Sequence, residues 1–183
     1  MVTTEQKSIL SVKDLQIYFN TDEGVVRAVD GVTFDLAQGK TLGVVGESGC
    51  GKSTVGRALL QILDRNGRIN GGEISWIRAS EEGEETINIA KQSRNSAIMR
   101  SIRGDDIALV FQEPMTSFSP VHTIGNQLME MIRLHKDVSK SDAKQRAIEL
   151  LEMVHIPNPE QRVNEYSFQL SGGLRQRAMI AMA

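Results

Sequence analysis

The chain has 183 residues, of which 40% are hydrophobic and 24% charged, proportions that are ordinary for a globular domain. Its formal net charge of −2 gives no reason to expect non-specific binding to nucleic acid. A single cysteine excludes an internal disulfide bond, and no apolar run is long enough to span a bilayer. We therefore expect any association with a membrane to depend on a partner.

The first part of the chain predicts strands. Residues 9–19 alternate apolar and polar side chains, residues 21–24 form a turn signal, and residues 25–36 alternate again. Residues 40–45 are a short apolar run bounded by polar residues, which predicts a buried strand. Residues 54–63 have the spacing of an amphipathic helix.

The segment between that predicted strand and helix carries the pattern G-x-x-x-x-G-K-[ST], which is typical of a phosphate-binding loop. Its glycines let backbone N–H groups point inward, and the helix that follows adds its positive end. Lys52 would reach the β- and γ-phosphates as a cation, and the Ser53 hydroxyl would bind Mg²⁺. The candidate nucleotide-binding residues here are Gly46, Glu47, Ser48, Gly49, Cys50, Gly51, Lys52, Ser53 and Thr54.

Two simpler interpretations stand beside this one. A glycine-rich turn with an incidental lysine would give the same pattern, but the flanking strand and helix signals disfavour it. Cys50 lies inside the loop, where we expect a small side chain that faces away from the nucleotide and has no redox role.

The middle of the chain mixes loop, strand and helix signals. Glycines mark residues 66–72 as a loop, and residues 73–77 predict a strand. The acidic residues 80–88 predict an exposed loop or hairpin, and residues 91–102 predict a helix. Residues 107–111 are apolar throughout and predict a further buried strand.

The character changes after Pro114, and residues 116–183 predict a helical lobe after the αβ lobe of residues 1–115. Ser139 and Ser141 are both candidate N-caps for a helix that ends near Val154. The apolar residues of an earlier helix recur at helical spacing, at Ile124, Leu128, Met131 and Ile132.

Two further motifs narrow the interpretation. Ser171, Gly172 and Gly173 precede a predicted helix, which makes either an anion site or an ordinary N-cap. Gln112 ends the predicted strand 107–111, where a polar residue could simply terminate the strand. In order and spacing, these motifs and the phosphate loop together resemble the ATP-binding cassette (ABC) ATPases.

The resemblance is to the dipeptide, oligopeptide and nickel importer branch, and it covers nearly the whole chain. Residues 27–34, 103–117 and 175–183 carry it beside the motifs. It implies an α/β P-loop NTPase, an ABC-type nucleotide-binding domain with an antiparallel β subdomain and a helical subdomain. The implied activity is ATP hydrolysis coupled to the import of peptides or a similar small solute, on the cytoplasmic face of the cell membrane.

The resemblance also implies site residues and partners. Gln112 would reach Mg²⁺ and the attacking water, and Phe19, or alternatively Tyr18, would stack on adenine. Ser171, Gly172 and Gly173 would face the phosphate loop of a second ATP-binding subunit in a head-to-tail dimer. Transmembrane permease subunits are the other implied partners, and nucleic acid is not expected.

The sequence departs from the family's pattern in two places. Ser167 and Phe168 stand where the family often has Pro-His, and Leu174 follows the Ser-Gly-Gly motif. The family's Walker B aspartate and catalytic glutamate have no counterpart up to Ala183, so we expect an incomplete domain with poor hydrolysis.

Three alternatives therefore remain open from the sequence. The chain could be a transport ATPase, a nucleotide-binding fragment that does not hydrolyse ATP, or, less favoured, an ABC ATPase acting on DNA. The histidines of the chain do not have metal-ligand spacing, and we expect them on the surface or in the core: His122, His135 and His155.

Overall fold

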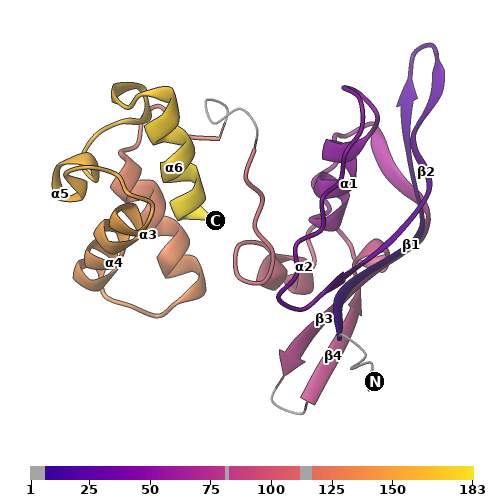
Figure 1. Ribbon diagram of the computed structural model, residues 1–183, viewed down its shortest axis with the longest axis horizontal. Coiled ribbons are helices and arrows are strands. Elements are labelled where there is room, and N and C mark those ends of the chain that lie inside the picture. The colour runs from indigo at the N-terminus through magenta and orange to yellow at the C-terminus, as the bar shows by residue number, and fades with distance from the viewer. Residues whose placement is uncertain (1–6, 81–82, 112–116) are drawn as a thin grey trace, which may run out of the picture. The chain divides into compact units, whose positions relative to one another are not determined.

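The computed structural model describes residues 7–80, 83–111 and 117–183 (Figure 1). The chain divides into two compact units, Met1–Asp106 and Ile107–Ala183. No helix of the described ranges is long and apolar enough to cross a membrane.

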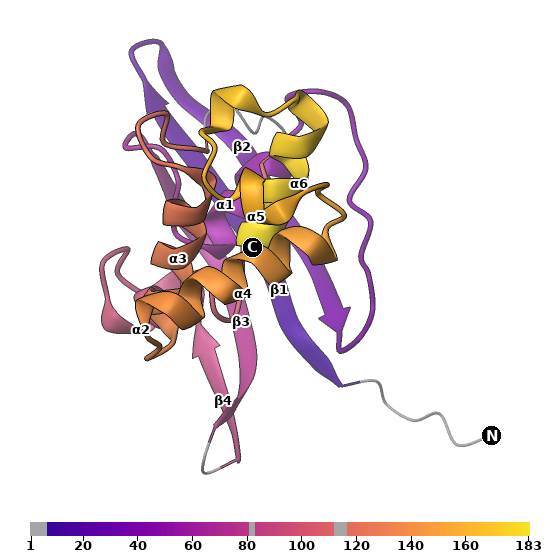
Figure 2. The ribbon, with the colours of Figure 1, turned by 90° about the vertical axis from the view of Figure 1, so that its left-hand side faces the viewer.

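The first unit is built on a four-stranded antiparallel sheet in the order β2-β1-β3-β4. Its strands are β1 (Ser8–Thr21), β2 (Gly24–Ala37), β3 (Gly67–Ser80) and β4 (Gly83–Asn88). Its helices are α1 (Lys52–Leu59), the 3₁₀ turn η1 (Ile89–Lys91) and α2 (Ala97–Ile102). Figure 2 shows β3 and β4 as a projecting hairpin, so residues 83–88 form the hairpin that was one of the two expectations for them.

The core of this unit lies on one face of the sheet. The inner residues of β1 include Val12, Leu15 and Ile17, each fully buried. Val55 and Ala58 are the buried residues of α1, because they lie three positions apart and so share one side of the helix. The strands predicted over residues 9–19 and 25–36 form as β1 and β2.

Two expected buried strands do not form. Residues 40–45 have no strand structure, and Val45 is 91% exposed. Residues 107–111 are likewise not a strand, and Val110 is 43% exposed. An apolar run becomes a strand only where a neighbouring segment supplies ladder hydrogen bonds, and among the described residues none pairs with either run as a strand.

Three other boundaries differ from expectation. The predicted loop 66–72 is wrong, because β3 already begins at Gly67. The helix predicted over 54–63 ends at Leu59, since Gln61 takes a left-handed conformation with φ of 53°. Only the second half of the helix predicted over 91–102 is helical, as α2.

The regular structure of the second unit is helical (Figure 1). It contains α3 (Ile124–His135), α4 (Lys140–Met153), α5 (Pro159–Arg162), the 3₁₀ turn η3 (Ser167–Gln169) and α6 (Gly172–Met182). Helices α3, α4 and α6 pack around one apolar cluster, formed by Phe118, Ile124, Leu128, Ala147, Leu151, Ile156, Val163, Leu170, Ala178, Met179 and Ala181.

The helix caps of this unit follow the sequence closely. Ser139, not Ser141, is the N-cap of α4, and its Oγ accepts a hydrogen bond from the Asp142 N–H at 3.1 Å. The helix ends at Met153 with Val154 as its C-cap, where the sequence predicted its end.

The start of α3 is joined by backbone hydrogen bonds to the segment that precedes α6. The Ile124 N–H donates to the Glu165 carbonyl, and the Gly125 N–H donates to the Val163 carbonyl, both at 2.8 Å. The approach is close, since a Cβ on Gly125 would lie 2.5 Å from the Val163 carbonyl oxygen. Any larger residue at this position would force the two segments apart.

Candidate functional site

The glycine loop and the start of α1 form a continuous structure, as the motif predicts. The Cys50 N–H donates to the Glu47 carbonyl at 3.3 Å, which closes a turn. Gly51 is the N-cap of α1 with φ of 94°, and its carbonyl accepts from the Val55 N–H at 3.0 Å. A Cβ on Gly51 would lie 2.5 Å from the Ala28 carbonyl oxygen, so both backbone conformation and space require glycine here.

Lys52 is held inside this loop by the loop's own carbonyl oxygens. Its Nζ donates to the carbonyl of Gly46 at 2.9 Å and to that of Glu47 at 2.6 Å. The Cys50 Sγ lies 3.6 Å from the same ammonium group, on the lysine side of the loop. The Lys52 ammonium therefore already has carbonyl acceptors in the loop, which a bound anion would replace.

The other loop residues are accessible to a ligand. Glu47, Ser48, Gly49 and Ser53 are exposed, and Cys50 is an exposed free thiol. Ser53 and Thr54 lie in the first turn of α1, whose N–H groups have no partner within the helix. An anion cradle of backbone N–H groups beside a lysine fits the phosphates of a nucleotide, and the Ser53 hydroxyl fits a Mg²⁺ ligand.

The two aromatic residues predicted near the nucleotide lie on opposite faces of β1. Phe19 lies two residues after Ile17, which pairs with Val29 of β2. A Val29 methyl would lie 3.2 Å from a Cβ on Gly51, so this face of the sheet borders the phosphate loop. Because successive side chains of a strand point to opposite faces of the sheet, Phe19 lies on the same face as Ile17 and Tyr18 lies on the other.

Each aromatic also has its own contacts. The Phe19 ring covers Gly67 of β3, where a Cβ would come within 2.5 Å of the ring. The Tyr18 hydroxyl donates to Asp30 at 3.0 Å, and the Arg27 guanidinium lies 5.4 Å from the ring centroid. Desolvation, and then the hydrogen bond to Asp30 and its charge, raise the pKa of Tyr18, while Arg27 acts in the opposite direction.

The Ser-Gly-Gly motif caps α6. Ser171 is the N-cap, and its Oγ accepts from the Leu174 N–H at 3.4 Å. Gly172 and Gly173 form the exposed first turn, and a Cβ on either would meet no atom within 4 Å. Space inside this unit therefore does not require glycine at these two positions. Capping of α6 by Ser171 does not explain why Gly172 and Gly173 are glycines, whereas close approach of a ligand or partner to their backbone would explain it.

One predicted site residue, Gln112, lies outside the described residues. Within the described part of the chain, no group of three or more His, Cys, Asp or Glu side chains is placed to hold a metal ion. His122 is hydrogen-bonded to the Ser119 hydroxyl through its Nδ1 at 2.9 Å.

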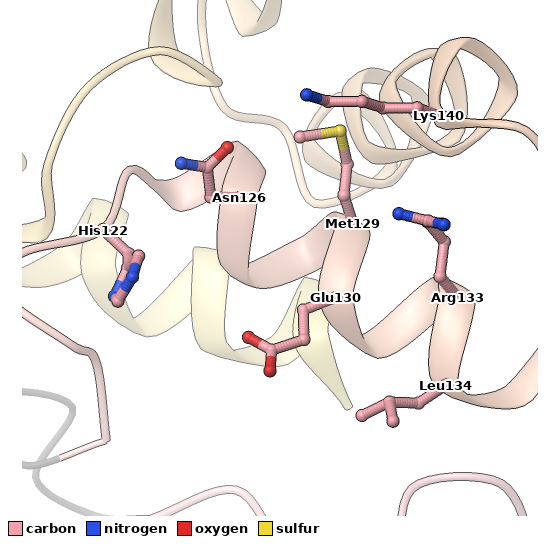
Figure 3. Close-up of a pocket in the computed structure, with 7 residues that line it drawn as sticks. All are labelled: His122, Asn126, Met129, Glu130, Arg133, Leu134 and Lys140. Atoms are coloured by element: carbon pink, nitrogen blue, oxygen red, sulfur yellow. The ribbon is translucent and has the colours of Figure 1, made fainter.

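A pocket that the sequence analysis did not identify opens beside α3. It has a volume of about 440 Å³, and Figure 3 shows Met129 and Arg133 on one side of α3 and Glu130 and Leu134 on the other. Leu134 is 67% exposed, although it is a large apolar residue. The residues that line the pocket are His122, Asn126, Met129, Glu130, Arg133, Leu134 and Lys140.

Comparison with known proteins shows which family this chain is similar to. The profile of the family described as "ABC transporter" matches residues 29–183. A probable peptide ABC transporter ATP-binding protein, y4tR, of Sinorhizobium fredii is 43% identical over 96% of this chain and 50% of its own length. The oligopeptide transport ATP-binding protein OppD of Bacillus subtilis is 43% identical over 96% of this chain and 46% of its own length. The chain thus spans about half the length of these curated relatives.

Solved structures agree on the fold. The dimeric structure of MJ0796, a bacterial ABC transporter cassette, superposes with a TM-score of 0.75 at 24% identity, over 94% of this chain and 68% of that one. A dimeric post-hydrolysis state of the same cassette, bound to ADP and Pi, gives a TM-score of 0.73 at 23% identity. The fold class expected from the sequence, an ABC-type nucleotide-binding domain, is confirmed.

Proposed function

The chain belongs to the ABC transporter family of ATP-binding proteins, and we propose that it binds ATP as part of an importer for peptides or a similar small solute. The geometry that carries the proposal is the loop around Lys52, in which the ammonium is held between the Gly46 and Glu47 carbonyls. Phosphate oxygens would replace those carbonyls as acceptors, and free N–H groups at the start of α1 would bind them as well.

Magnesium would complete the site when nucleotide is bound. Ser53 supplies a hydroxyl in the first turn of α1, close in sequence to the lysine that binds the same phosphates. Gln112 is the second proposed ligand and would also orient the attacking water, a role that rests on the resemblance to the family alone. ATP hydrolysis coupled to transport is the proposed activity of the whole protein.

A second ATP-binding subunit is the first proposed partner. Gly172 and Gly173 have open space around them, and Ser171 directs its hydroxyl to the same turn. This exposed helix N-terminus would bind the γ-phosphate held by the partner's loop in a head-to-tail dimer. Helix α6 begins at this motif, with Ser171 as its N-cap.

Permease subunits are the second proposed partner, and the pocket beside α3 is the proposed contact for them. It combines the exposed Leu134 with the half-buried Met129 and the charges of Glu130 and Arg133 (Figure 3). Such a mixture suits a short amphipathic segment better than a free ion. This contact would hold the protein at the cytoplasmic face of the cell membrane. The names of the relatives, which describe peptide and oligopeptide transport, favour this function over a role on DNA.

Calorimetric titration with MgATP tests the proposal directly. The chain should bind about one equivalent, and Lys52→Ala should abolish binding, because the lysine supplies the charge inside the loop. Lys136→Ala is the matched control, since Lys136 is an exposed lysine at the end of α3 outside the pocket. Unchanged ATP affinity in Lys52→Ala would refute the assignment. Phosphate release measured beside binding separates a hydrolytic domain from one that only binds.

A further inference from the structure

A second pocket, with no role in the proposed ATP site, opens in the first unit between the end of α1 and the start of β3. It has a volume of about 300 Å³. Its polar lining consists of Gln61, Asp64, Arg65, Arg68, Gln92 and Arg94. A cavity of this size has room for a small ligand, and its mostly polar lining suits a hydrophilic one.

The lining carries an excess of positive charge that the described residues do not neutralise. Three arginines face one acid, and that acid, Asp64, is already paired with Arg57 at 3.3 Å. Among the residues that the structure describes, Arg65, Arg68 and Arg94 have no carboxylate partner. The excess is local, since the whole chain has a net charge of −2.

A fourth arginine adds to the positive charge near the pocket. The Arg103 Nε donates to the Leu60 carbonyl at 2.7 Å, and its Nη2 donates to the Gln61 carbonyl at 3.4 Å. Burial lowers the pKa of Arg103, and the charge of Arg94 lowers it further. Two guanidinium groups therefore repel each other here, and an anion bound between the arginines of this region would offset that repulsion.

Hydrogen bonds help to hold the pocket in shape. The Gln61 side-chain amide donates to the Ile89 carbonyl at 2.8 Å, which ties the end of α1 to η1. Arg94 donates one hydrogen bond through its Nη1, to the Leu63 carbonyl at 3.4 Å. Its other guanidinium N–H groups remain for a ligand. A wall that is already fixed reduces the entropy lost when a ligand binds.

We infer that this pocket binds a small phosphate-bearing anion through Arg65, Arg68 and Arg94. Guanidinium groups bind phosphate oxygens in pairs, with planar geometry and charge-assisted hydrogen bonds. With three arginines and one acid, the lining has a formal charge of 3 − 1 = +2, which matches a phosphate dianion. The site is separate from the phosphate loop, and its occupancy does not depend on the proposed function.

Equilibrium dialysis with radiolabelled inorganic phosphate tests the site in the Lys52→Ala chain, in which the phosphate loop is disabled. This chain should still bind about one phosphate. Arg68→Gln and Arg94→Gln should each weaken binding about tenfold, equivalent to about 1.4 kcal/mol. Arg94→Lys should recover part of the phosphate affinity that Arg94→Gln loses, because lysine restores the positive charge but not the planar guanidinium group.

Arg100→Gln is the matched control, because Arg100 is an exposed arginine on α2 of the same unit and does not line the pocket. An equal loss in Arg100→Gln, or no phosphate binding to Lys52→Ala, would overturn the inference. Circular dichroism melts of each variant show that the comparison is between folded chains.

A second experiment, sedimentation with lipid vesicles, distinguishes a free anion from a lipid headgroup. Vesicles of phosphatidylcholine with phosphatidylglycerol should sediment the chain through the same arginines if the phosphate belongs to a lipid. If the phosphate belongs to a soluble molecule, dialysis should detect binding and the vesicles should not retain the chain. Vesicle binding that survives Arg68→Gln and Arg94→Gln would count against the pocket.

Discussion

Gln127 and Ser119 exchange two hydrogen bonds across the loop that leads into α3. The Ser119 N–H donates to the Gln127 Oε1 at 2.8 Å, and the Gln127 Nε2 donates back to the Ser119 carbonyl at 3.2 Å. The same Nε2 lies 3.0 Å from the His122 carbonyl. Gln127 is only 8% exposed, so one buried amide fixes the path of the chain before α3.

Replacement of this amide should destabilise the helical unit. Gln127→Leu removes the partner of the Ser119 N–H and of two carbonyls at a partly buried place, which should cost about 1–3 kcal/mol in the free energy of unfolding. Urea denaturation measures the loss. Gln145→Leu on the exposed face of α4 should change stability by about 0.5 kcal/mol or less. Equal effects at the two positions would contradict the structural role of Gln127.

Two glycines of the phosphate loop should differ in their tolerance of alanine. Gly51→Ala meets both a φ of 94° and a carbonyl oxygen at 2.5 Å, whereas Gly49→Ala meets a φ of 83° and open space. We expect Gly49→Ala to cost about 1–2 kcal/mol from backbone conformation alone. Gly51→Ala should cost more and displace the loop from β2. Thermal melts compare the two variants, and a Gly49→Ala loss equal to or larger than that of Gly51→Ala would show that the contact with Ala28 is unimportant.

Phe19 and Tyr18 should have separable effects on nucleotide binding. Phe19→Ala removes the aromatic on the face that borders the phosphate loop, and base stacking of this kind contributes about 1–3 kcal/mol. ATP affinity should therefore fall, while affinity for inorganic triphosphate, which has no base, should change little. Tyr18→Ala provides the comparison. A larger loss of ATP affinity in Tyr18→Ala would assign the stacking role to Tyr18.

The contacts of Tyr18 also predict a pH effect on stability. Its folded pKa is raised above the ordinary value of about 10, so its neutral form is favoured in the folded state. The corresponding stability is fully present below that ordinary value and is lost as the pH rises through the folded pKa. Ultraviolet titration should show Tyr18 ionising above its ordinary pKa, and Asp30→Asn should lower its pKa. Tyr18→Phe, which leaves Tyr166 alone, isolates the signal.

Ser171 should affect turnover far more than stability. Ser171→Ala removes the cap on α6 and should cost about 0.5–2 kcal/mol. Ser139→Ala removes the equivalent cap on α4, so it is a matched control for stability. If Ser171 also binds a phosphate in a dimer of the whole protein, only Ser171→Ala should reduce ATP hydrolysis there. Parallel losses of hydrolysis in both variants would limit Ser171 to capping.

The sequence predicted local features well where neighbouring residues alone determine them. Ser139 and Ser171 cap helices because their hydroxyls bond N–H groups three residues later, and that spacing is visible in the sequence. The glycine loop is local in the same sense. The Lys52 ammonium reaches carbonyls only five and six residues away.

Features that depend on distant partners were not predictable in this way. Residues 40–45 have the composition of a buried strand, but strand structure requires a neighbour that the composition cannot identify. Gly67 looked like part of a loop, although the Phe19 ring covers it within the sheet. The arginine pocket draws on two separate segments, residues 61–69 and 90–94, so no single stretch of sequence shows it.

The backbone ties between the start of α3 and the segment before α6 make these two regions one mechanical element. Gly125 and Val163 are bonded at 2.8 Å with no room for a side chain between them, and Thr123 bridges to Tyr166. Because no room is left between Gly125 and Val163, we expect a displacement of the loop before α3 to move the segment that leads to Ser171 as well.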